Sequence, residues 1–288
     1  MKFGLRYCNT GRYTDLNLAT ELLLAGEEAG FDSAWTVEHT ILPGGHVSQY
    51  PYSADGKIAG GRLDFPLPDP LIWMSFLASR TSTIKLGTAI LILPQHSPVV
   101  AAKQIATLDA MSGGRVLLGI GVGWLREEFE MIGADFETRA ARTDEYVHAL
   151  RALWEQEAPS FEGDFVSFKE AYCRPQPAQG TVPIIIGGHS PAAARRAGRL
   201  GDGFFPAREI SSDLLDVVYR TAEEHGRDPE TIEITTSIPE TLNQLPALQA
   251  LGVHRIMLPV NPTPGMYSPI RRPEDVLKFA SVIDTYKD

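Results

Sequence analysis

Residues 33–39 read Ser-Ala-Trp-Thr-Val-Glu-His, an apolar run that ends in an acid and an imidazole before a loop rich in Pro and Gly. The apolar part has the length and composition of a buried strand. Glu38 and His39 then fall at its carboxyl end, where neither side chain suits a hydrophobic core. If the strand belongs to a parallel barrel, both side chains lie on the face that carries active sites.

The same strand-then-helix pattern repeats along the whole chain. Strands are expected at 3–7, 33–37, 84–91, 116–120, 183–187, 203–206, 232–237 and 255–260. Helices are expected at 18–29, 70–80, 99–111, 126–132, 142–156, 191–200, 214–225, 242–251 and 273–286. Eight such units predict one α/β domain over residues 1–288, a (β/α)8 TIM barrel. An open doubly wound sheet, the alternative, more often has five or six strands and a Gly-rich first turn.

Two connections are longer than a simple turn requires. Residues 40–69 form an insertion after the second strand, with glycines at 44, 45, 56, 60 and 61 and three aromatic side chains, Tyr50, Tyr52 and Phe65. We expect the substrate to enter under this insertion, whose aromatics favour an apolar or aromatic substrate. A smaller insertion, 157–182, precedes the fifth strand and is expected to hold a short hairpin around 165–168.

Charge and composition narrow the possible functions. Among 288 residues, 26 are Lys or Arg and 36 are Asp or Glu, a formal charge of −10 that disfavours nucleic acid as a partner. Cys8 and Cys173, the two cysteines, imply no disulfide framework. The seven histidines show no metal-ligand spacing, so we expect no metal site. No apolar run is long enough for a membrane span, and the chain starts directly as a strand, so we expect a cytoplasmic protein.

Candidate site residues lie at the predicted strand ends. An imidazole can move a proton or bind a ligand at neutral pH, which makes His39 the first candidate. A surface salt bridge or a structural histidine is the alternative. After the third strand, Thr88, Ala89 and Ile90 follow a glycine, and small residues there allow a flat ligand to approach the backbone. A plain buried strand explains the same residues equally well.

The fourth strand ends in alternating glycines, which include Gly121 and Gly123. They remove side chains from one face and are expected to open space beside the strand. Trp124 stands where a dinucleotide fingerprint needs its third glycine, so that motif fails. Trp124 is instead a candidate stacking wall. Glu127 and Glu128 follow on a short helix, as site residues or as an ordinary solvated face.

The fifth strand runs through Gly187, Gly188, His189 and Ser190 directly into a helix. Free N–H groups and the helix dipole favour a phosphate there, although a tight turn is the alternative. The residues alone therefore predict a barrel that holds a flat, phosphate-bearing ligand beside an acid–base pair. They leave the ligand unnamed.

Taken together, these motifs resemble the bacterial luciferase-like monooxygenase superfamily, and within it the coenzyme F420-dependent oxidoreductases. The resemblance covers essentially the whole chain and is carried by residues 31–39, 86–89, 118–129, 186–188 and 197–204. It implies that the barrel mouth binds the deazaflavin ring of F420 at the second to fourth strands, with FMN as the alternative cofactor. Members are commonly homodimers.

The resemblance also implies roles for particular residues. His39 would contact the ring or the substrate, a non-prolyl cis peptide near Ala89–Ile90 would back the ring, and residues 187–190 would hold the cofactor phosphate. The expected cofactor-binding residues are His39, Thr88, Ala89, Ile90, Gly121, Gly123, Trp124, Glu127, Gly187, Gly188, His189 and Ser190.

One departure affects the chemistry. Sugar-phosphate dehydrogenases of this group carry a catalytic Glu where this chain has Trp124, which argues against sugar-phosphate oxidation. His39 is then the favoured proton donor, with Glu38 and Glu127 as the other catalytic candidates. The expected function is hydride transfer between reduced F420 and a small organic substrate. The alternatives are an FMN-dependent monooxygenase and a flavin- or F420-binding protein without turnover.

Overall fold

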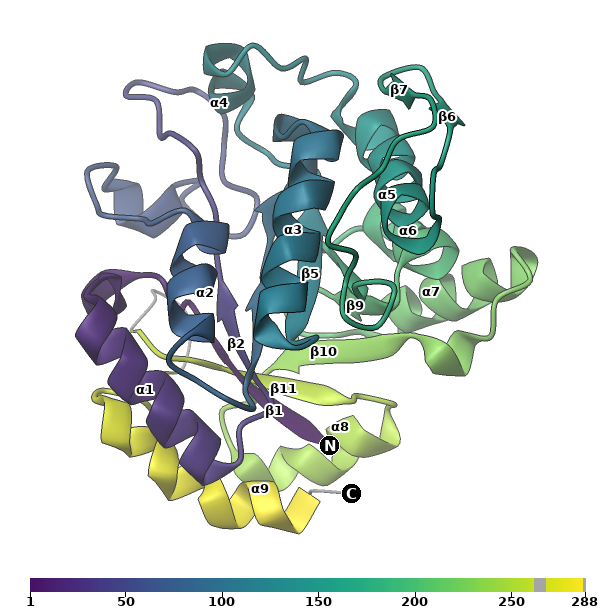
Figure 1. The fold of residues 1–288 in the computed structure, drawn as a ribbon. Helices are drawn as coiled ribbons and strands as arrows, with labels where there is room; N and C mark the ends of the chain where they lie inside the picture. The colour runs from purple at the N-terminus through teal and green to yellow at the C-terminus, as the bar shows by residue number, and fades with distance from the viewer. Residues whose placement is uncertain (262–267, 287–288) are drawn as a thin grey trace.

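Parallel strands close into a barrel with eight members, as predicted (Figure 1). The structure is a computed structural model that describes residues 1–261 and 268–286, except for the side chains of residues 59 and 60. The barrel strands are β1 (Lys2–Arg6), β2 (Ser33–Thr36), β3 (Lys85–Thr88), β5 (Val116–Gly121), β8 (Ile184–Gly187), β9 (Gly203–Phe205), β10 (Glu233–Ser237) and β11 (Arg255–Pro259). Pairing of β1 with β11 and of β3 with β5 completes the ring.

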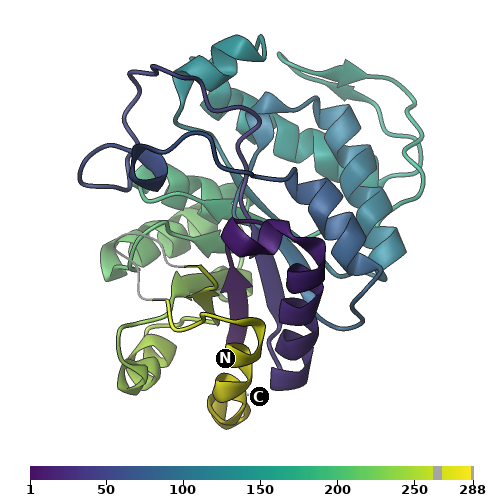
Figure 2. The same cartoon turned by 90° about the vertical axis from the view of Figure 1, so that its left-hand side faces the viewer.

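Helices surround this ring in both views (Figures 1 and 2). They are α1 (Leu16–Ala29), α2 (Pro70–Ala78), α3 (Pro98–Ser112), α4 (Arg126–Met131), α5 (Arg139–Glu155), α6 (Pro191–Leu200), α7 (Ser212–Glu224), α8 (Leu245–Ala250) and α9 (Ala280–Tyr286). Short 3-10 helices are η1 (Gly11–Thr14), η2 (Ile58–Gly61), η3 (Leu93–Gln95), η4 (Pro229–Thr231), η5 (Leu242–Gln244) and η6 (Pro273–Phe279). Within the described residues, no helix is both long and apolar enough to cross a membrane.

Two segments differ from the prediction. The strand expected at 84–91 ends at Thr88, and the chain then passes through a cis peptide bond between Ala89 and Ile90 to β4 (Leu91–Ile92). The cis peptide therefore lies where the resemblance placed it. The hairpin of the smaller insertion begins earlier than expected, because β6 (Phe161–Glu162) pairs antiparallel with β7 (Ser167–Phe168).

The amino end of the barrel interior is filled by an ionic cluster. Its described members are Lys2, Asp32, Lys85, Glu233 and Arg255. The guanidinium of Arg255 donates to Asp32 over 2.8 Å and also contacts Glu233, and this side chain is 1% exposed. Each buried charge therefore has an opposite charge beside it, which is what burial of ions requires.

Apolar side chains fill the barrel from this cluster toward the carboxyl end of the strands. They are Trp35, Leu117, Ile185, Phe205 and Met257. A Cβ added at Gly87 would lie 2.5 Å from the ring of Trp35. The space beside this glycine therefore holds a protein side chain, and the approach of a flat ligand to the backbone of residues 88–90 stays a prediction. Arg6 and Ser237, the last residues of β1 and β10, follow at the carboxyl end.

Candidate active site

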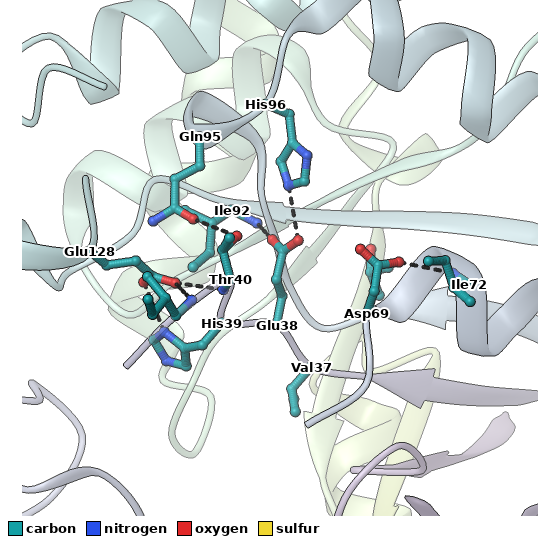
Figure 3. Close-up of polar contacts among 12 residues, drawn as sticks. Val37, Glu38, His39, Thr40, Asp69, Ile72, Ile92, Gln95, His96 and Glu128 are labelled. Carbon is teal, nitrogen blue, oxygen red and sulfur yellow. Dashed lines mark hydrogen bonds and ion pairs between the residues drawn. The ribbon is translucent and has the colours of Figure 1, made fainter. Parts of the chain in front are cut away.

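His39 is held at the barrel mouth by Glu128 (Figure 3). Its Nδ1 lies 2.9 Å from Oε2 of Glu128, whose side chain is fully buried on α4. The other oxygen of Glu128 accepts from the backbone N–H groups of Thr40 and Ile41, at 2.7 and 3.2 Å. Because a carboxylate only accepts, Nδ1 carries the hydrogen, and Nε2 remains for a ligand.

Glu38 turns away from its neighbour His39 (Figure 3). One of its oxygens accepts from the N–H of Ile92, and the other lies 2.9 Å from Nε2 of His96. Burial acts to lower the pKa of His96, but the hydrogen bond and the charge of Glu38 outweigh it and raise that pKa. Glu38 thus ties the end of β2 to β4 and η3, which weighs against it as a catalytic residue.

Glu127 binds the long insertion rather than His39. Its Oε1 accepts from the N–H groups of Val47 and Ser48, at 2.7 and 3.1 Å. Desolvation acts to raise the pKa of Glu127, but hydrogen bonds from Ser48 and Val47 outweigh it and lower the pKa to about 2. A carboxyl group with that pKa holds no proton at neutral pH, which weighs against Glu127 as the proton donor.

Trp124 joins His39 to the insertion through edge-on ring contacts. Its ring centroid lies 5.9 Å from those of His39 and His46 and 5.2 Å from that of Tyr50. Tyr50 in turn contacts Tyr52 at 5.5 Å. Figures 1 and 2 show the insertion and α4 at the same end of the barrel. The insertion is therefore folded over the mouth, with Trp124 beneath it.

The glycines at the strand ends leave less space than predicted. A Cβ at Gly121 would lie 2.8 Å from Cδ1 of Ile90, and one at Gly187 would lie 2.4 Å from its Cγ2. At Gly123, a Cβ would lie 2.6 Å from the ring of Phe129. The expectation of open space is wrong because protein side chains fill it. The glycines instead allow Ile90, which follows the cis peptide, to pack between two strands and form part of the mouth.

Thr88 and Ala89 are the remaining residues of the third strand end that were predicted to contact the ring. Thr88 is buried, and its hydroxyl donates to the carbonyl of Gly119 over 2.7 Å, so its side chain already has a protein partner. Ala89 is half-buried and packs against the apolar interior of the barrel. A ligand at this strand end would therefore meet Ala89 and Ile90 rather than the hydroxyl of Thr88.

The segment before α6 keeps the features of an anion site. Gly188 has a φ of 131°, a conformation that glycine adopts readily, and Ser190 caps the helix by accepting from the N–H of Ala193. Nδ1 of His189 is buried without a hydrogen-bond partner among the described residues. Burial, with a smaller effect of Arg208, lowers the pKa of His189. A phosphate bound at residues 187–190 stays a prediction, with the tight turn as its alternative.

A thiol nucleophile at Cys8 and a bound metal ion are two other ways in which a site could carry out chemistry. Burial raises the pKa of Cys8 to about 12, partly offset by a hydrogen bond to Trp35, so this thiol is not a nucleophile at neutral pH. No group of three His, Cys, Asp or Glu side chains in residues 1–261 and 268–286 is placed to hold a metal ion.

The sequence did not show which of two adjacent glutamates contacts His39. Glu128, rather than Glu127, contacts His39, although both follow Trp124 on the same short helix. The sequence contained the signal, two adjacent acids, but the choice between them depends on the rotation of α4 against the mouth. Adjacent helical residues point about 100° apart, so only one of the two can face His39.

Comparison with curated proteins identifies relatives over most of the chain. The family model for luciferase-like monooxygenases matches residues 4–245. An F420-dependent glucose-6-phosphate dehydrogenase of Kineococcus radiotolerans is 31% identical over 269 residues, 90% of this chain and 74% of that protein. An uncharacterised protein of Mycobacterium tuberculosis is 30% identical over 237 residues, 80% of this chain and 83% of that protein.

Solved structures share the fold. The coenzyme F420-dependent tetrahydromethanopterin reductase of Methanopyrus kandleri superposes with a TM-score of 0.76 at 16% identity, over 100% of this chain and 99% of that chain. A monooxygenase of Streptomyces bottropensis superposes with a TM-score of 0.72 at 22% identity, over 100% of both chains. At these identities the likeness shows the fold alone. Because the family model matches well over half of its length, the chain belongs to the luciferase-like monooxygenase family.

Proposed function

We propose that this chain is an oxidoreductase that uses coenzyme F420 to transfer a hydride to or from a small organic substrate. The observation that carries the proposal is His39, fixed by Glu128 at the barrel mouth with Nε2 left for a ligand. The F420-dependent relative named above supports the choice of cofactor. The family description supports a redox reaction in general.

The residues present fit this cofactor. Ala89, Ile90 and Trp124 offer an apolar wall for a flat ring beside His39, and the unpartnered Nδ1 of His189 stands where a phosphate would lie. When bound, F420 supplies or accepts the hydride, which is chemistry that no side chain provides. The chain supplies the orientation of the reactants and the proton.

His39 is the proposed proton-handling group. A hydride added to one atom of a C=C or C=N bond leaves charge on its neighbour, and a positioned acid lowers the barrier by neutralising that charge. Nδ1 of His39 is committed to Glu128, so the proton would move at Nε2. Glu128 acts through His39: it fixes the ring orientation and stabilises the charged imidazolium.

The insertion would exclude water during the reaction. Glu127 holds it at Val47 and Ser48, Glu128 holds it at Thr40 and Ile41, and Arg208 donates to the carbonyl of Pro51 over 3.1 Å. A closed mouth strengthens the electrostatic contacts inside it. The aromatic rings on its inner side support an apolar or aromatic substrate.

The test is a titration of the purified protein with F420 and, separately, with FMN, followed by absorbance and fluorescence. We expect F420 to bind with a Kd in the micromolar range or below. Binding of FMN with no binding of F420 would replace the proposal by the second candidate, an FMN-dependent monooxygenase, which the description of the family favours. Binding of F420 without turnover of any electron-poor alkene, imine or alcohol would indicate a binding protein.

A further inference from the structure

Arg6 is a buried cation at the barrel mouth with an incomplete set of partners. It is the last residue of β1 and is 6% exposed. Its Nη1 donates to Oγ of Ser237 over 3.0 Å, while its buried Nε has no hydrogen-bond partner in the part of the chain that the structure describes. Among the described residues, no carboxylate lies within ion-pair distance of this guanidinium.

Aromatic rings surround the guanidinium. Its central carbon lies 4.4 Å from the ring centroid of Tyr7 and 5.0 Å from that of Phe205. Burial raises the pKa of Tyr50, from the insertion above, and the charge of Arg6 partly offsets this rise. Ring faces attract a cation, but they do not satisfy its N–H donors.

A buried guanidinium in this state is costly unless a negative group joins it. Removal of a charge from water is offset only by close opposite charge and by completed hydrogen bonds. Among the described residues, Arg6 makes one hydrogen bond, to a neutral hydroxyl, and has an unsatisfied donor. An anion bound from solution would complete these contacts, and a carboxylate matches the planar guanidinium with two parallel hydrogen bonds.

The position of Arg6 assigns that anion to the substrate rather than to the cofactor. The groups proposed to hold F420 lie at the ends of β2, β3, β5 and β8. Arg6, Phe205 and Ser237 end β1, β9 and β10, which form the other part of the ring. A molecule bound against these three strands would face the cofactor across the mouth.

We propose that Arg6 is the anion-binding residue of the substrate subsite, and that the substrate is a small carboxylic acid with an apolar or aromatic body. The carboxylate would pair with the guanidinium, and Tyr7, Phe205 and Tyr50 would contact the body. Ser237 orients Arg6 by accepting its Nη1 hydrogen. The proposal rests on the proposed function in one respect only, the assignment of the opposite strands to F420.

The test measures binding of three acids and their isosteric amides by titration calorimetry: trans-cinnamate, benzoate and 3-phenylpropanoate. At least one acid should bind the protein about tenfold or more tightly than its amide, as expected for a hydrogen-bonded charge pair. This comparison uses the unaltered protein. Equal binding of acid and amide across the three pairs would overturn the proposal.

Substitutions then test whether Arg6 causes the preference for the acid over its amide. Arg6→Met should remove the preference for the acid, Arg6→Lys should retain part of it, and Ser237→Ala should reduce it less than Arg6→Met does. Arg220→Met is the matched control, because Arg220 is an exposed arginine of α7 that pairs with Glu224 and has no part in the proposed site, and it should keep the preference. An unchanged preference in folded Arg6→Met protein would overturn the proposal.

Titration with F420 separates this proposal from the proposed function. Arg6→Met should leave the Kd for F420 within about twofold of the unaltered protein, because no contact with the cofactor is lost. If Arg6→Met weakens F420 as strongly as it weakens the acid, Arg6 belongs to the cofactor site and the proposal fails. If no F420 binds but the acid preference depends on Arg6, the subsite stands and the choice of cofactor fails.

Discussion

The two ends of the barrel interior each hold a buried arginine, and the arginines differ in what satisfies them. Arg255, at the amino end, contacts both Asp32 and Glu233. Arg6, at the carboxyl end, has a neutral partner in Ser237 and a donor that none of the described residues satisfies. A buried charge that the protein itself completes indicates a structural role, and one that it leaves incomplete indicates a ligand. We call the amino end, which holds Arg255, the supporting end of the barrel, and the carboxyl end, which holds Arg6, its working end.

The largest expected effect is at the working end. His39→Ala should lower turnover about 10²–10⁴-fold, because it removes the proposed proton donor. Its cost in stability should stay near 1 kcal/mol, because Glu128 keeps two N–H donors from the insertion. Oxidation of reduced F420 with the best acceptor from a panel of electron-poor alkenes gives the turnover, and thermal unfolding gives the stability.

His96→Ala is the matched control for that prediction. His96 also bonds a buried glutamate, Glu38, but it does not contact His39 or Trp124 in any described interaction. We expect this variant to lose thermal stability while the folded fraction keeps its turnover. Parallel loss of activity and stability in the His39 variant would instead make His39 a structural residue.

The next largest effect tests the supporting end. Arg255→Met should destabilise the protein by about 3 kcal/mol, because two half-buried carboxylates lose their shared partner. Arg6→Met should change stability by less than about 1 kcal/mol, because no buried anion is left behind. Urea unfolding of both variants measures the contrast. Similar destabilisation by both substitutions would remove the distinction between the two ends.

Glu128→Gln should have a smaller effect, roughly tenfold in turnover, because the amide still contacts His39 without stabilising its charged form. The diagnostic readout is the pH profile: the alkaline limb of the His39-dependent rate should move to lower pH, because a proton donor is lost as the pH rises, whereas a loss of packing alone would lower the rate at every pH. Glu127→Gln is the control, since Glu127 accepts only from the insertion. Its pH profile should match that of the unaltered protein.

The smallest effect is a pH dependence of stability at the supporting end. Burial acts to raise the pKa of Asp32, but the charges of Arg255 and Lys85 outweigh it and lower that pKa below its ordinary value of 3.8. Stability from this carboxylate is thus complete above pH 3.8 and is lost as the pH falls through the lower, folded-state pKa. Urea unfolding between pH 2 and 6 should show this loss. Arg255→Met should flatten it, and an unchanged slope would contradict the assignment.

The fold was predictable from local patterns because each barrel strand is a short buried run bounded by turn residues. The break after Thr88 was not predictable from pattern alone, since residues 84–91 read as one continuous strand. The reason for a glycine at positions 121 and 187 could not be predicted from the sequence either. Both are small to accommodate Ile90, which lies at least 30 residues away in sequence, so the reason is a tertiary contact.

The site was predictable in part. His39 was identified by its place at a strand end, but its true partner depends on how α4 is rotated, which no local pattern reports. Arg6 could have been found: Phe3 and Leu5 face the helices, so Gly4 and Arg6 must face the barrel interior. A charged residue in that alternation, at the carboxyl end of a strand, is a signal that sequence reading can use.

The root of the insertion and the orientation of His39, the proposed proton donor, both depend on Glu128. One of its oxygens accepts from Thr40 and Ile41 at the root of the insertion, and the other accepts from His39. Displacement of the root would withdraw two hydrogen bonds from the carboxylate that orients the imidazole. Under the proposed function, an insertion displaced from the mouth would therefore also leave the imidazole less firmly oriented for proton transfer.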